Sequence, residues 1–350
     1  MSRARRFSIC FCLALLSLAV LAPAAHAWAF WSVDFIGPST GWVGGEYGFV
    51  MKTTNGGKTW VVQHKGGVND VWSVNFVNAS RGWAVSSTDG ILRTTNGGKS
   101  WSKRSVACDW GFHDLYSVKF ISKSVGWAVG GFPDGRWEDT HQPYGTLYSS
   151  TNGGRSWSRV NCSTSCPMAV DARSATTVVA VGMDRVQPGP DSGYNVVAKW
   201  ISGGLGWTGP TRLPSYDAHG GELYAVDRAA GALAVAGGWY LSGPAIARTI
   251  DGGLTWTLTT PPALTDVRGI KMATSLVGYA VGQGSTTKLL KTTDGGASWF
   301  TKSVPSGSHL WGVDFVTAST GYAVGYREAT PLKGLVLKTV NGGTTWKRVR

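Results

Sequence analysis

Short apolar runs rich in aromatic and β-branched residues recur along the chain and are separated by glycine-rich turns. Near the two ends, the pattern predicts strands over residues 32–36, 41–45, 48–53, 59–63, 310–316, 321–325, 335–339 and 345–349. Runs of such residues bounded by Gly-rich turns are typical of β-strands. The second strand of several units carries a large ring, a small residue and Val, as in Trp83-Ala84-Val85, which suits twisted sheets that stack on one another. We therefore predict an all-β protein.

A turn motif recurs between these strands: a hydroxyl residue, any residue, Asn or Asp, a Gly pair, two residues and Trp. The motif occurs in six intact copies. The Asn or Asp and the Trp of each copy are, in order, Asn55 and Trp60, Asn96 and Trp101, Asn152 and Trp157, Asp251 and Trp256, Asp294 and Trp299, and Asn341 and Trp346. A decayed copy fills the large gap in the series and ends at Trp207. The mean spacing of about 48 residues is the length of a four-stranded propeller blade.

Seven such units fill the chain, so we predict a seven-bladed β-propeller of four-stranded antiparallel blades, as a single domain over residues 28–350. Both ends coincide with whole blades. The ring is therefore predicted to close through contacts between blades, without a strand shared between the termini. Composition agrees, because 49 of the 350 residues are Gly, which disfavours a helix bundle.

The repeated motif is predicted to be structural. Asn replaces Asp in four of the six intact copies, so a negative charge is not required at this position. Asn and Asp share a short oxygen acceptor that can cap backbone N–H groups in a tight turn. The Gly pair permits positive φ, and the Trp buries a ring beneath the turn. We expect no catalytic residue here, and the sequence indicates no cofactor and no metal site.

Residues 1–27 have the features of a secretory signal peptide. Three arginines precede an apolar run over residues 7–21, and Ala25-His26-Ala27 resembles a cleavage site. The run is short for a spanning helix, which needs about 20 residues. We predict an exported protein, extracellular or periplasmic and monomeric, with no transmembrane segment after cleavage. An uncleaved anchor is the alternative.

Three cysteines follow the predicted leader: Cys108, Cys162 and Cys166. An odd number in an oxidising compartment favours one disulfide and one free thiol over a zinc site. Cys108 could pair with Cys162 or Cys166 and tie two neighbouring loops together, or Cys162 could pair locally with Cys166.

Nearly all the irregular loops fall on one predicted face of the ring, where strands two and three and successive blades are joined. Insertions in repeat proteins collect on the binding face. We therefore predict a partner-binding surface formed by Trp110, Phe112, His113, Arg136, Trp137, Glu138, Asp139, His141, Tyr144, Arg185, Tyr240 and Arg327. The rings would serve as anchors and the arginines as anion contacts. The alternatives are that these loops only pack on one another, or that the short acidic stretch beside His141 carries acid–base chemistry.

Three repeated segments together resemble the photosystem II stability and assembly factor family. They are Val-Asp-Phe at 33–35, Gly-Trp-Ala-Val-Gly at 126–130 and Thr-Thr-Asn-Gly-Gly-Lys-Thr-Trp at 53–60, the last being the Asp box of BNR-type propellers. The resemblance covers residues 31–350. It implies a luminal or exported seven-bladed propeller, a non-enzymatic scaffold that binds a newly made membrane-protein subunit. In a photosynthetic organism, it would place the protein in the thylakoid lumen.

Two other functions compete with this one. Sialidase-like glycoside hydrolases also carry Asp boxes, but the chain lacks an Arg-Ile-Pro signature near its start, and residues 28–35 contain no Arg. A secreted propeller that binds a cell-surface protein or glycan would share the same scaffold. The net charge of +13 favours anionic partners such as acidic protein segments, whereas the absence of a basic run disfavours nucleic acid.

Overall fold

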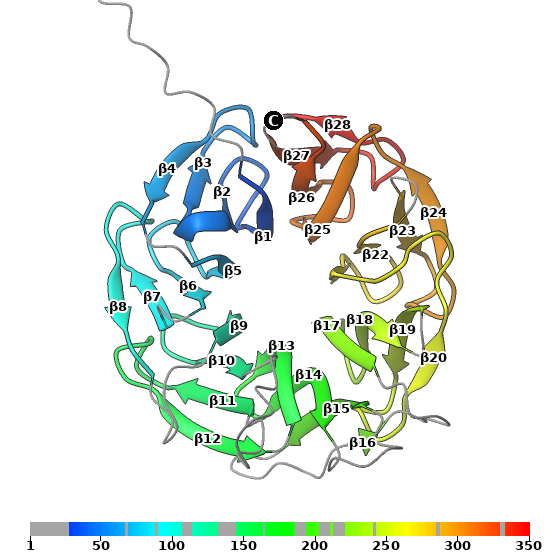
Figure 1. The fold of residues 1–350 in the computed structure, drawn as a ribbon, viewed down its shortest axis with the longest axis horizontal. Coiled ribbons are helices and arrows are strands. Elements are labelled where there is room, and N and C mark those ends of the chain that lie inside the picture. Colours follow the sequence, from blue (N-terminus) through cyan, green and yellow to red (C-terminus); the bar gives the residue numbers. More distant parts are fainter. Residues whose placement is uncertain are drawn as a thin grey trace, which may run out of the picture.

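Seven four-stranded antiparallel sheets surround a central channel in the computed structural model, which describes residues 28–66, 69–87, 90–106, 114–131, 145–163, 165–185, 194–202, 211–212, 221–240, 243–284, 288–329 and 333–350 (Figure 1). In every sheet, consecutive strands are neighbours. The first strand of each blade lines the channel and the fourth lies at the rim (Figure 1). The predicted seven-bladed propeller, closed without a shared terminal strand, is confirmed.

The first three blades cover the N-terminal half of the ring. Blade one contains β1 (Phe30–Phe35), β2 (Gly41–Gly45), a short 3₁₀ turn η1 (Glu46–Gly48), β3 (Val50–Thr53) and β4 (Val61–His64). Blade two contains β5 (Val71–Phe76), β6 (Gly82–Ser86), β7 (Gly90–Thr94) and β8 (Ser102–Arg104). Blade three contains β9 (Asp114–Phe120), β10 (Gly126–Gly131), β11 (Gly145–Ser150) and β12 (Ser158–Ser163).

The remaining four blades follow in the same order. Blade four contains β13 (Ser165–Ser174), β14 (Thr177–Arg185), β15 (Tyr194–Ser202) and β16 (Thr211–Arg212). Blade five contains β17 (Gly221–Arg228), β18 (Ala234–Tyr240), β19 (Gly243–Thr249) and β20 (Thr257–Thr259). Blade six contains β21 (Gly269–Met272), β22 (Gly278–Val281), β23 (Lys288–Thr292) and β24 (Phe300–Ser303). Blade seven contains β25 (Ser308–Phe315), β26 (Gly321–Arg327), β27 (Lys333–Thr339) and β28 (Lys347–Arg348).

The repeated turn is held by a hydroxyl and an amide. In blade one, Thr53 Oγ1 accepts the N–H of Gly57 at 2.9 Å and donates to Asn55 Oδ1 at 3.0 Å. Asn55 Oδ1 also accepts the N–H of Thr59 at 2.9 Å, so Thr59 belongs to the turn and β4 begins later than predicted. Gly56 and Gly57 have φ of +70° and +87°, values that other residues rarely adopt.

The same hydrogen bonds recur in five other blades, whether the central residue is Asn or Asp. The hydroxyl that accepts the second Gly N–H belongs to Thr94, Ser150, Thr249, Thr292 and Thr339. Asp251 and Asp294 accept the backbone N–H of Thr255 and Ser298, as Asn55 does that of Thr59. In these turns, the position therefore acts as an oxygen acceptor.

The hydrophobic core lies between blades. Trp42 of β2 is fully buried, and its ring stacks at 3.6 Å on Phe76 of the next blade. Its Nε1 donates to the carbonyl of Gly97 in that blade's turn at 3.2 Å. Trp83 and Tyr279 pack in the same way on Phe120 and Phe315. Every such ring therefore fixes both the packing and the position of its neighbouring blade.

Ring closure between blades seven and one uses these same contacts. Tyr322 stacks on Phe35 at 3.5 Å, and its hydroxyl donates to the carbonyl of Pro38 at 2.6 Å. The N–H of Phe35 donates to Asp314 Oδ2 at 2.9 Å. The first and last blades thus meet as ordinary neighbours.

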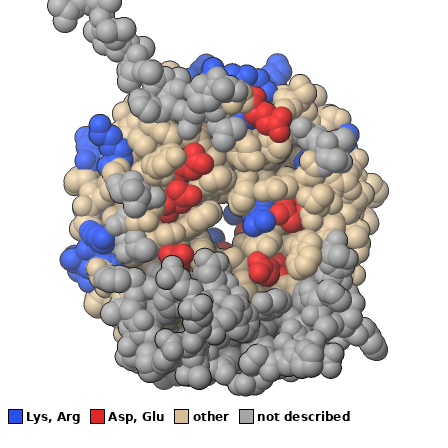
Figure 2. All heavy atoms as spheres, in the orientation of Figure 1, with Lys and Arg blue, Asp and Glu red and all other residues tan. Residues whose placement is uncertain are grey.

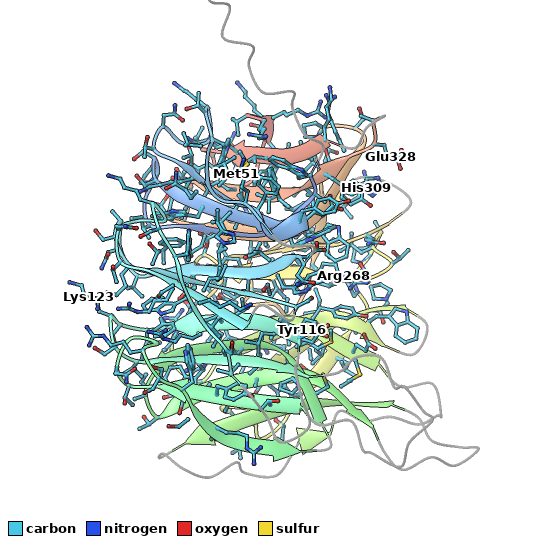
Figure 3. All side chains as sticks on the ribbon, turned by 60° about the vertical axis from the view of Figure 1, so that its left-hand side comes forward. Met51, Tyr116, Lys123, Arg268, His309 and Glu328 are labelled. Atoms are coloured by element: carbon cyan, nitrogen blue, oxygen red, sulfur yellow. The ribbon has the colours of Figure 1, made fainter. Side chains whose placement is uncertain are left out.

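The ring has two different faces. On the turn face, the repeated turns lie against the loops that join strands one and two, as where the N–H of Gly56 donates to Ser39 O at 2.8 Å. The mouth face carries the links between blades and the loops that join strands two and three. Figure 3 shows Lys123 of the turn face on one side and Arg268, His309 and Glu328 of the mouth face on the other. Within the described ranges, no helix has the length and hydropathy needed to cross a membrane.

Candidate functional site

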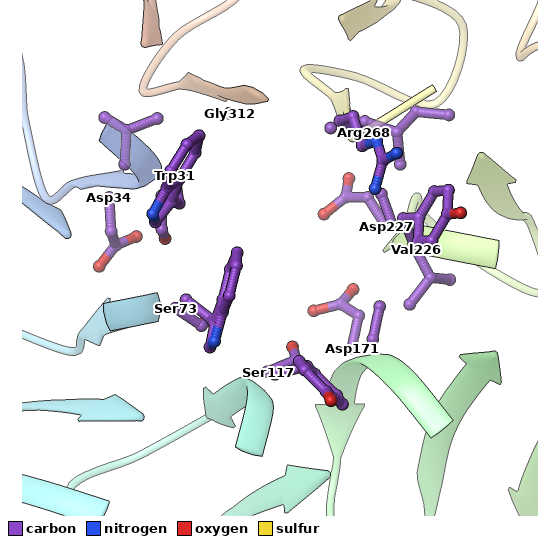
Figure 4. A pocket seen from close by; sticks show the side chains of 18 of the residues that line it. Trp31, Asp34, Ser73, Ser117, Asp171, Val226, Asp227, Arg268 and Gly312 are labelled. Carbon is purple, nitrogen blue, oxygen red and sulfur yellow. The ribbon is translucent and has the colours of Figure 1, made fainter. Parts of the chain in front are cut away.

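A β-bulge near the start of the innermost strand adds an extra residue in six blades. The residues skipped by the strand pairing are Trp31, Trp72, Tyr116, Met168, Tyr224 and Trp311. In blade six, Arg268 takes the equivalent place directly before β21. A bulge re-aims the side chain that it carries. All seven residues line the channel where it opens on the mouth face, and we call them the mouth cluster (Figure 4).

The rings of the mouth cluster form a nearly continuous arc. The Trp31 ring lies 5.9 Å from that of Trp72 and 4.6 Å from that of Trp311. Across the opening, the Arg268 guanidinium lies over Tyr224 at 4.0 Å and over Trp311 at 4.8 Å. Cations attract the negative face of such rings. The mouth therefore presents apolar surface with one cation embedded in it.

Polar contacts hold these side chains in place. Trp31 Nε1 donates to Asp70 Oδ2 at 3.1 Å, and Trp72 Nε1 donates to Ser87 Oγ at 2.8 Å. Arg268 Nε donates to Asp266 Oδ2 at 2.7 Å. Burial, together with the neighbouring Glu222, raises the pKa of Tyr224, which keeps its hydroxyl neutral. The cluster is thus pre-organised, which lowers the entropic cost of binding.

Three residues further along the same strands, a second ring of side chains lines the channel, which we call the charged ring. It consists of Asp34, Asn75, Lys119, Asp171, Asp227, Lys271 and Asp314. Figure 4 shows Asp34, Asp171 and Asp227 around the channel. Each carboxylate or amide accepts a backbone N–H from the next blade, such as that of Phe76 on Asp34 at 2.5 Å and that of Phe120 on Asn75 at 2.8 Å. These bonds join neighbouring blades.

The two lysines of the charged ring compensate part of its negative charge. Lys119 Nζ lies 2.7 Å from Asp171, and Lys271 Nζ lies 3.5 Å from both Asp227 and Asp314. The carboxylate of Asp227 is the main cause that raises the pKa of Lys271. Burial is the largest single influence on the pKa of Asp171 and raises it. The charge and hydrogen bond of Lys119, the charge of Lys271 and the N–H of Arg228 together outweigh burial and hold the pKa below its ordinary value.

Among the described ion pairs of the charged ring, none includes Asp34. Burial, and after it the charge of Asp314, raises its pKa from 3.8 to about 7. The Phe76 N–H and the more distant Lys119 and Lys271 only partly offset this. Near neutral pH, the ring therefore holds a carboxyl group that titrates.

Between the mouth cluster and the charged ring lies a cavity of about 200 Å³, lined by strands of all seven blades. Drug-sized ligands occupy pockets of about 300–1,000 Å³, so this cavity suits a single side chain or a short chain segment. In the part of the chain that the structure describes, no group of three or more His, Cys, Asp or Glu is placed to hold a metal ion.

The residues predicted from the sequence to bind a partner do not coincide with the mouth cluster. Those that lie outside the described residues are Trp110, Phe112, His113, Arg136, Trp137, Glu138, Asp139, His141 and Tyr144. Arg185 and Tyr240 end β14 and β18, but their side chains are not described. Arg327 ends β26 on the mouth face and is half-buried.

Sequence reasoning missed the mouth cluster, although a signal was present. In blades one to three, a Trp or Tyr precedes Ser and Val on the innermost strand, as in Trp31-Ser32-Val33. The disulfide alternatives stay predictions: Cys166 is buried, while Cys108 and the side chain of Cys162 lie outside the described part.

Comparison with known proteins agrees with the repeat analysis. A family model for the photosynthesis system II assembly factor YCF48 matches residues 65–187, which confirms the predicted resemblance to this family. No curated protein matches the sequence.

Several solved structures share the propeller fold. YCF48 bound to a D1 peptide is 20% identical, with a TM-score of 0.63 over 90% of this chain and 94% of that chain. YCF48 from Cyanidioschyzon merolae is 17% identical, with a TM-score of 0.61 over 91% and 97% of the two chains. The WD40 propeller domain of Doa1 is 13% identical, with a TM-score of 0.60 over 89% and 93%.

Proposed function

We propose that this chain, as a relative of the photosystem II assembly factors, is an exported, non-enzymatic scaffold that binds a segment of a partner protein at its mouth face. The mouth cluster is the observation that carries the proposal. The family match and the peptide complex of YCF48 support a protein as the class of partner. The leader predicted over residues 1–27 supports export, to the thylakoid lumen if the source organism contains photosystem II.

The chemistry of the mouth specifies the kind of segment that fits. Fixed Trp and Tyr rings bind apolar or aromatic side chains and act as hot spots in protein interfaces. Arg268 offers a cation for a carboxylate, a C-terminus or a backbone carbonyl, and its stacking on Tyr224 fixes its direction. A cavity of about 200 Å³ below accepts one inserted side chain. We infer a partner segment with an apolar or aromatic anchor next to a hydrogen-bond acceptor that reaches the Arg268 guanidinium.

The carboxylates of the channel favour a scaffold over a glycosidase. Glycosidases need a pair of carboxyl groups that are free to act as acid and as base or nucleophile. Here Asp171 and Asp227 each accept a backbone N–H from the next blade and pair with a lysine. Asp314 likewise accepts the N–H of Phe35. These groups are engaged in holding the ring.

Affinity capture tests the proposal. Residues 28–350, which contain all seven blades, are immobilised, and detergent-solubilised membranes of the source organism are passed over them. Captured proteins are identified, and a synthetic peptide that spans the captured segment is titrated against the propeller. Because both rings would lie at the centre of the interface, Trp72→Ala with Trp311→Ala should weaken peptide binding at least tenfold, as expected for hot-spot residues.

The matched control is Phe300→Ala, which removes an exposed ring from the rim strand β24 and should leave binding unchanged. Peptide affinity that is equal in the wild type and the double variant would reject the mouth cluster as the site. Hydrolysis of a sialoside or glucan panel by the wild type would reject the scaffold function.

A further inference from the structure

Positive charge gathers on the turn face of blades one to three. Lys58, Lys99 and Arg155 occupy the same position in three successive turns, directly after the Gly pair, and all three are exposed. Beside these turns, Arg81 donates from Nη1 to the carbonyl of Lys123 at 3.2 Å. The turns of these blades, with the adjoining loops between strands one and two, therefore carry five cationic side chains on one side of the ring.

Carboxylates do not balance this charge. Outside the channel, the turn-face carboxylates among the described residues are Asp251 and Asp294, which lie in blades five and six and bond within their own turns. The described carboxylates of the mouth face are Glu46, Asp70, Asp114, Glu222, Asp266 and Glu328. Figure 2, which views the mouth face, shows acidic residues around the central opening. The two faces thus differ in their charge.

The unbalanced positive charge of the turn face is concentrated around Arg93. Burial and the neighbouring Arg81, Arg155 and Arg104 lower its pKa, and no carboxylate counters them. Arg93 uses its Nε to bond Gly153 O at 2.7 Å in the next blade, so it has a structural role. Among the described residues, by contrast, the side chains of Lys58, Lys99 and Arg155 have neither a hydrogen-bond partner nor an ion-pair partner.

Apolar side chains project from the same face on the other side of the ring. Leu254 stands in the turn of blade five at the position that Lys58 holds in blade one, and it is 76% exposed. Ile250 and Val340 precede the Asp or Asn of their turns, and Leu276 lies in the first loop of blade six. These three are 58–67% exposed. The N–H of Gly295 donates to Leu276 O at 2.8 Å, which fixes that loop beside the turn.

We propose that the turn face docks on an anionic lipid bilayer. The basic side chains of blades one to three would contact the phosphate headgroups of the lipids. The exposed aliphatic side chains of blades five to seven would enter the interfacial region of the bilayer. Basic residues combined with protruding apolar side chains are the features of interfacial membrane binding. The basic side chains and the exposed apolar side chains lie on different blades, spread over one face of the ring. An extended anionic surface such as a bilayer can contact all of them at once, and therefore suits this face better than an acidic protein does. In this orientation, the mouth cluster faces away from the membrane, and the proposal is independent of its role.

Vesicle flotation tests this proposal. Residues 28–350 are mixed with vesicles of phosphatidylcholine containing 30% phosphatidylglycerol, or of phosphatidylcholine alone, at low and high salt. We expect binding to the anionic vesicles that falls steeply with salt and is weak on neutral ones. Loss of one basic residue lowers membrane partitioning about fivefold. Lys58→Glu, Lys99→Glu and Arg155→Glu together should therefore lower it at least about a hundredfold.

The control reverses the same number of exposed or half-exposed charges on the mouth-face side: Lys65→Glu, Lys288→Glu and Lys333→Glu. It should retain most of the binding, although the change in net charge is equal. A second variant, Leu254→Ser with Val340→Ser, should weaken binding at high salt more than at low salt. Equal losses in the two charge-reversed proteins, or binding to polyglutamate without binding to vesicles, would overturn the proposal.

Discussion

Replacing Asp34 with Asn should stabilise the propeller above neutral pH. The Asp34 carboxyl is buried beside Asp314, and its pKa is raised from 3.8 to about 7. Its one backbone bond, from the N–H of Phe76, needs only an oxygen acceptor. Blade two shows that an amide suffices there, because Asn75 Oδ1 accepts the N–H of Phe120 at 2.8 Å.

The sign and size of the effect follow from proton linkage. A carboxyl whose pKa is higher in the folded state contributes stability that is present below its unfolded pKa and is lost as pH rises through the folded one. For Asp34, this window runs from 3.8 to about 7. A shift of about three pKa units corresponds to about 4 kcal/mol at most. Asn cannot ionise, so the variant keeps the stability that the wild type loses when Asp34 ionises.

Urea unfolding of both proteins at pH 4.5 and pH 8.5 measures the difference. The variant should be more stable by only about 1 kcal/mol at the lower pH, which lies just above the unfolded pKa, and by about 2–4 kcal/mol at the higher one. Titrating groups remote from Asp34 cancel because the same protein background is compared. A variant no more stable than the wild type at pH 8.5 would refute the reasoning.

Asp171→Asn is the matched control with the opposite sign. The pKa of Asp171 is lowered, so its stabilisation is present above the ordinary value and is lost on acidification. Removing this carboxylate leaves Lys119, 2.7 Å away, without its buried partner. The variant should lose about 3–5 kcal/mol at pH 8.5.

Two further predictions concern the contacts between and within blades. Tyr322→Phe removes the hydroxyl bond to Pro38 O at the closure of the ring. Tyr279→Phe removes the hydroxyl bond from the corresponding residue of blade six to Gly342 O in the turn of blade seven. Each should cost about 1 kcal/mol in urea unfolding, and a much larger loss for Tyr322 would show that closure depends on a special contact. In the turn of blade two, Asn96→Asp should change stability by less than about 0.5 kcal/mol, because Asp251 makes the same bonds. Asn96→Leu should cost about 1–2 kcal/mol, and equal stability of the Leu and Asp variants would contradict the acceptor role.

Much of the scaffold could be predicted from the sequence because its signals are local. The repeated unit upstream of each turn predicted β2 with its observed bounds, Gly41–Gly45. The boundaries that shifted lie at turns, where side-chain hydrogen bonds decide the outcome. Thr59, for example, was assigned to a strand but bonds to Asn55 in the turn.

The candidate site was harder to predict for a physical reason. The loop insertions predicted a site in the irregular segments, whereas the mouth cluster lies at the innermost strands of the blades. Whether Trp72 or Tyr224 packs in the core or lines the channel depends on a β-bulge that displaces it from the strand alternation. A one-residue bulge leaves no local sequence mark strong enough to distinguish the two cases.

The sequence by itself determined the repeat, its blade length and the chemistry of the turn, because these depend on neighbouring residues and on the spacing of Gly and Trp. Only the tertiary structure decided the features to which several blades contribute, namely the closure of the ring, the charged ring and the mouth cluster. Closing the ring brings Phe35 and Tyr322, 287 positions apart, into a 3.5 Å stack, and sets the Asp34 and Asp314 carboxylates against each other. The perturbed pKa and the arc of rings at the mouth arise from seven strands meeting around one axis, which no single blade contains.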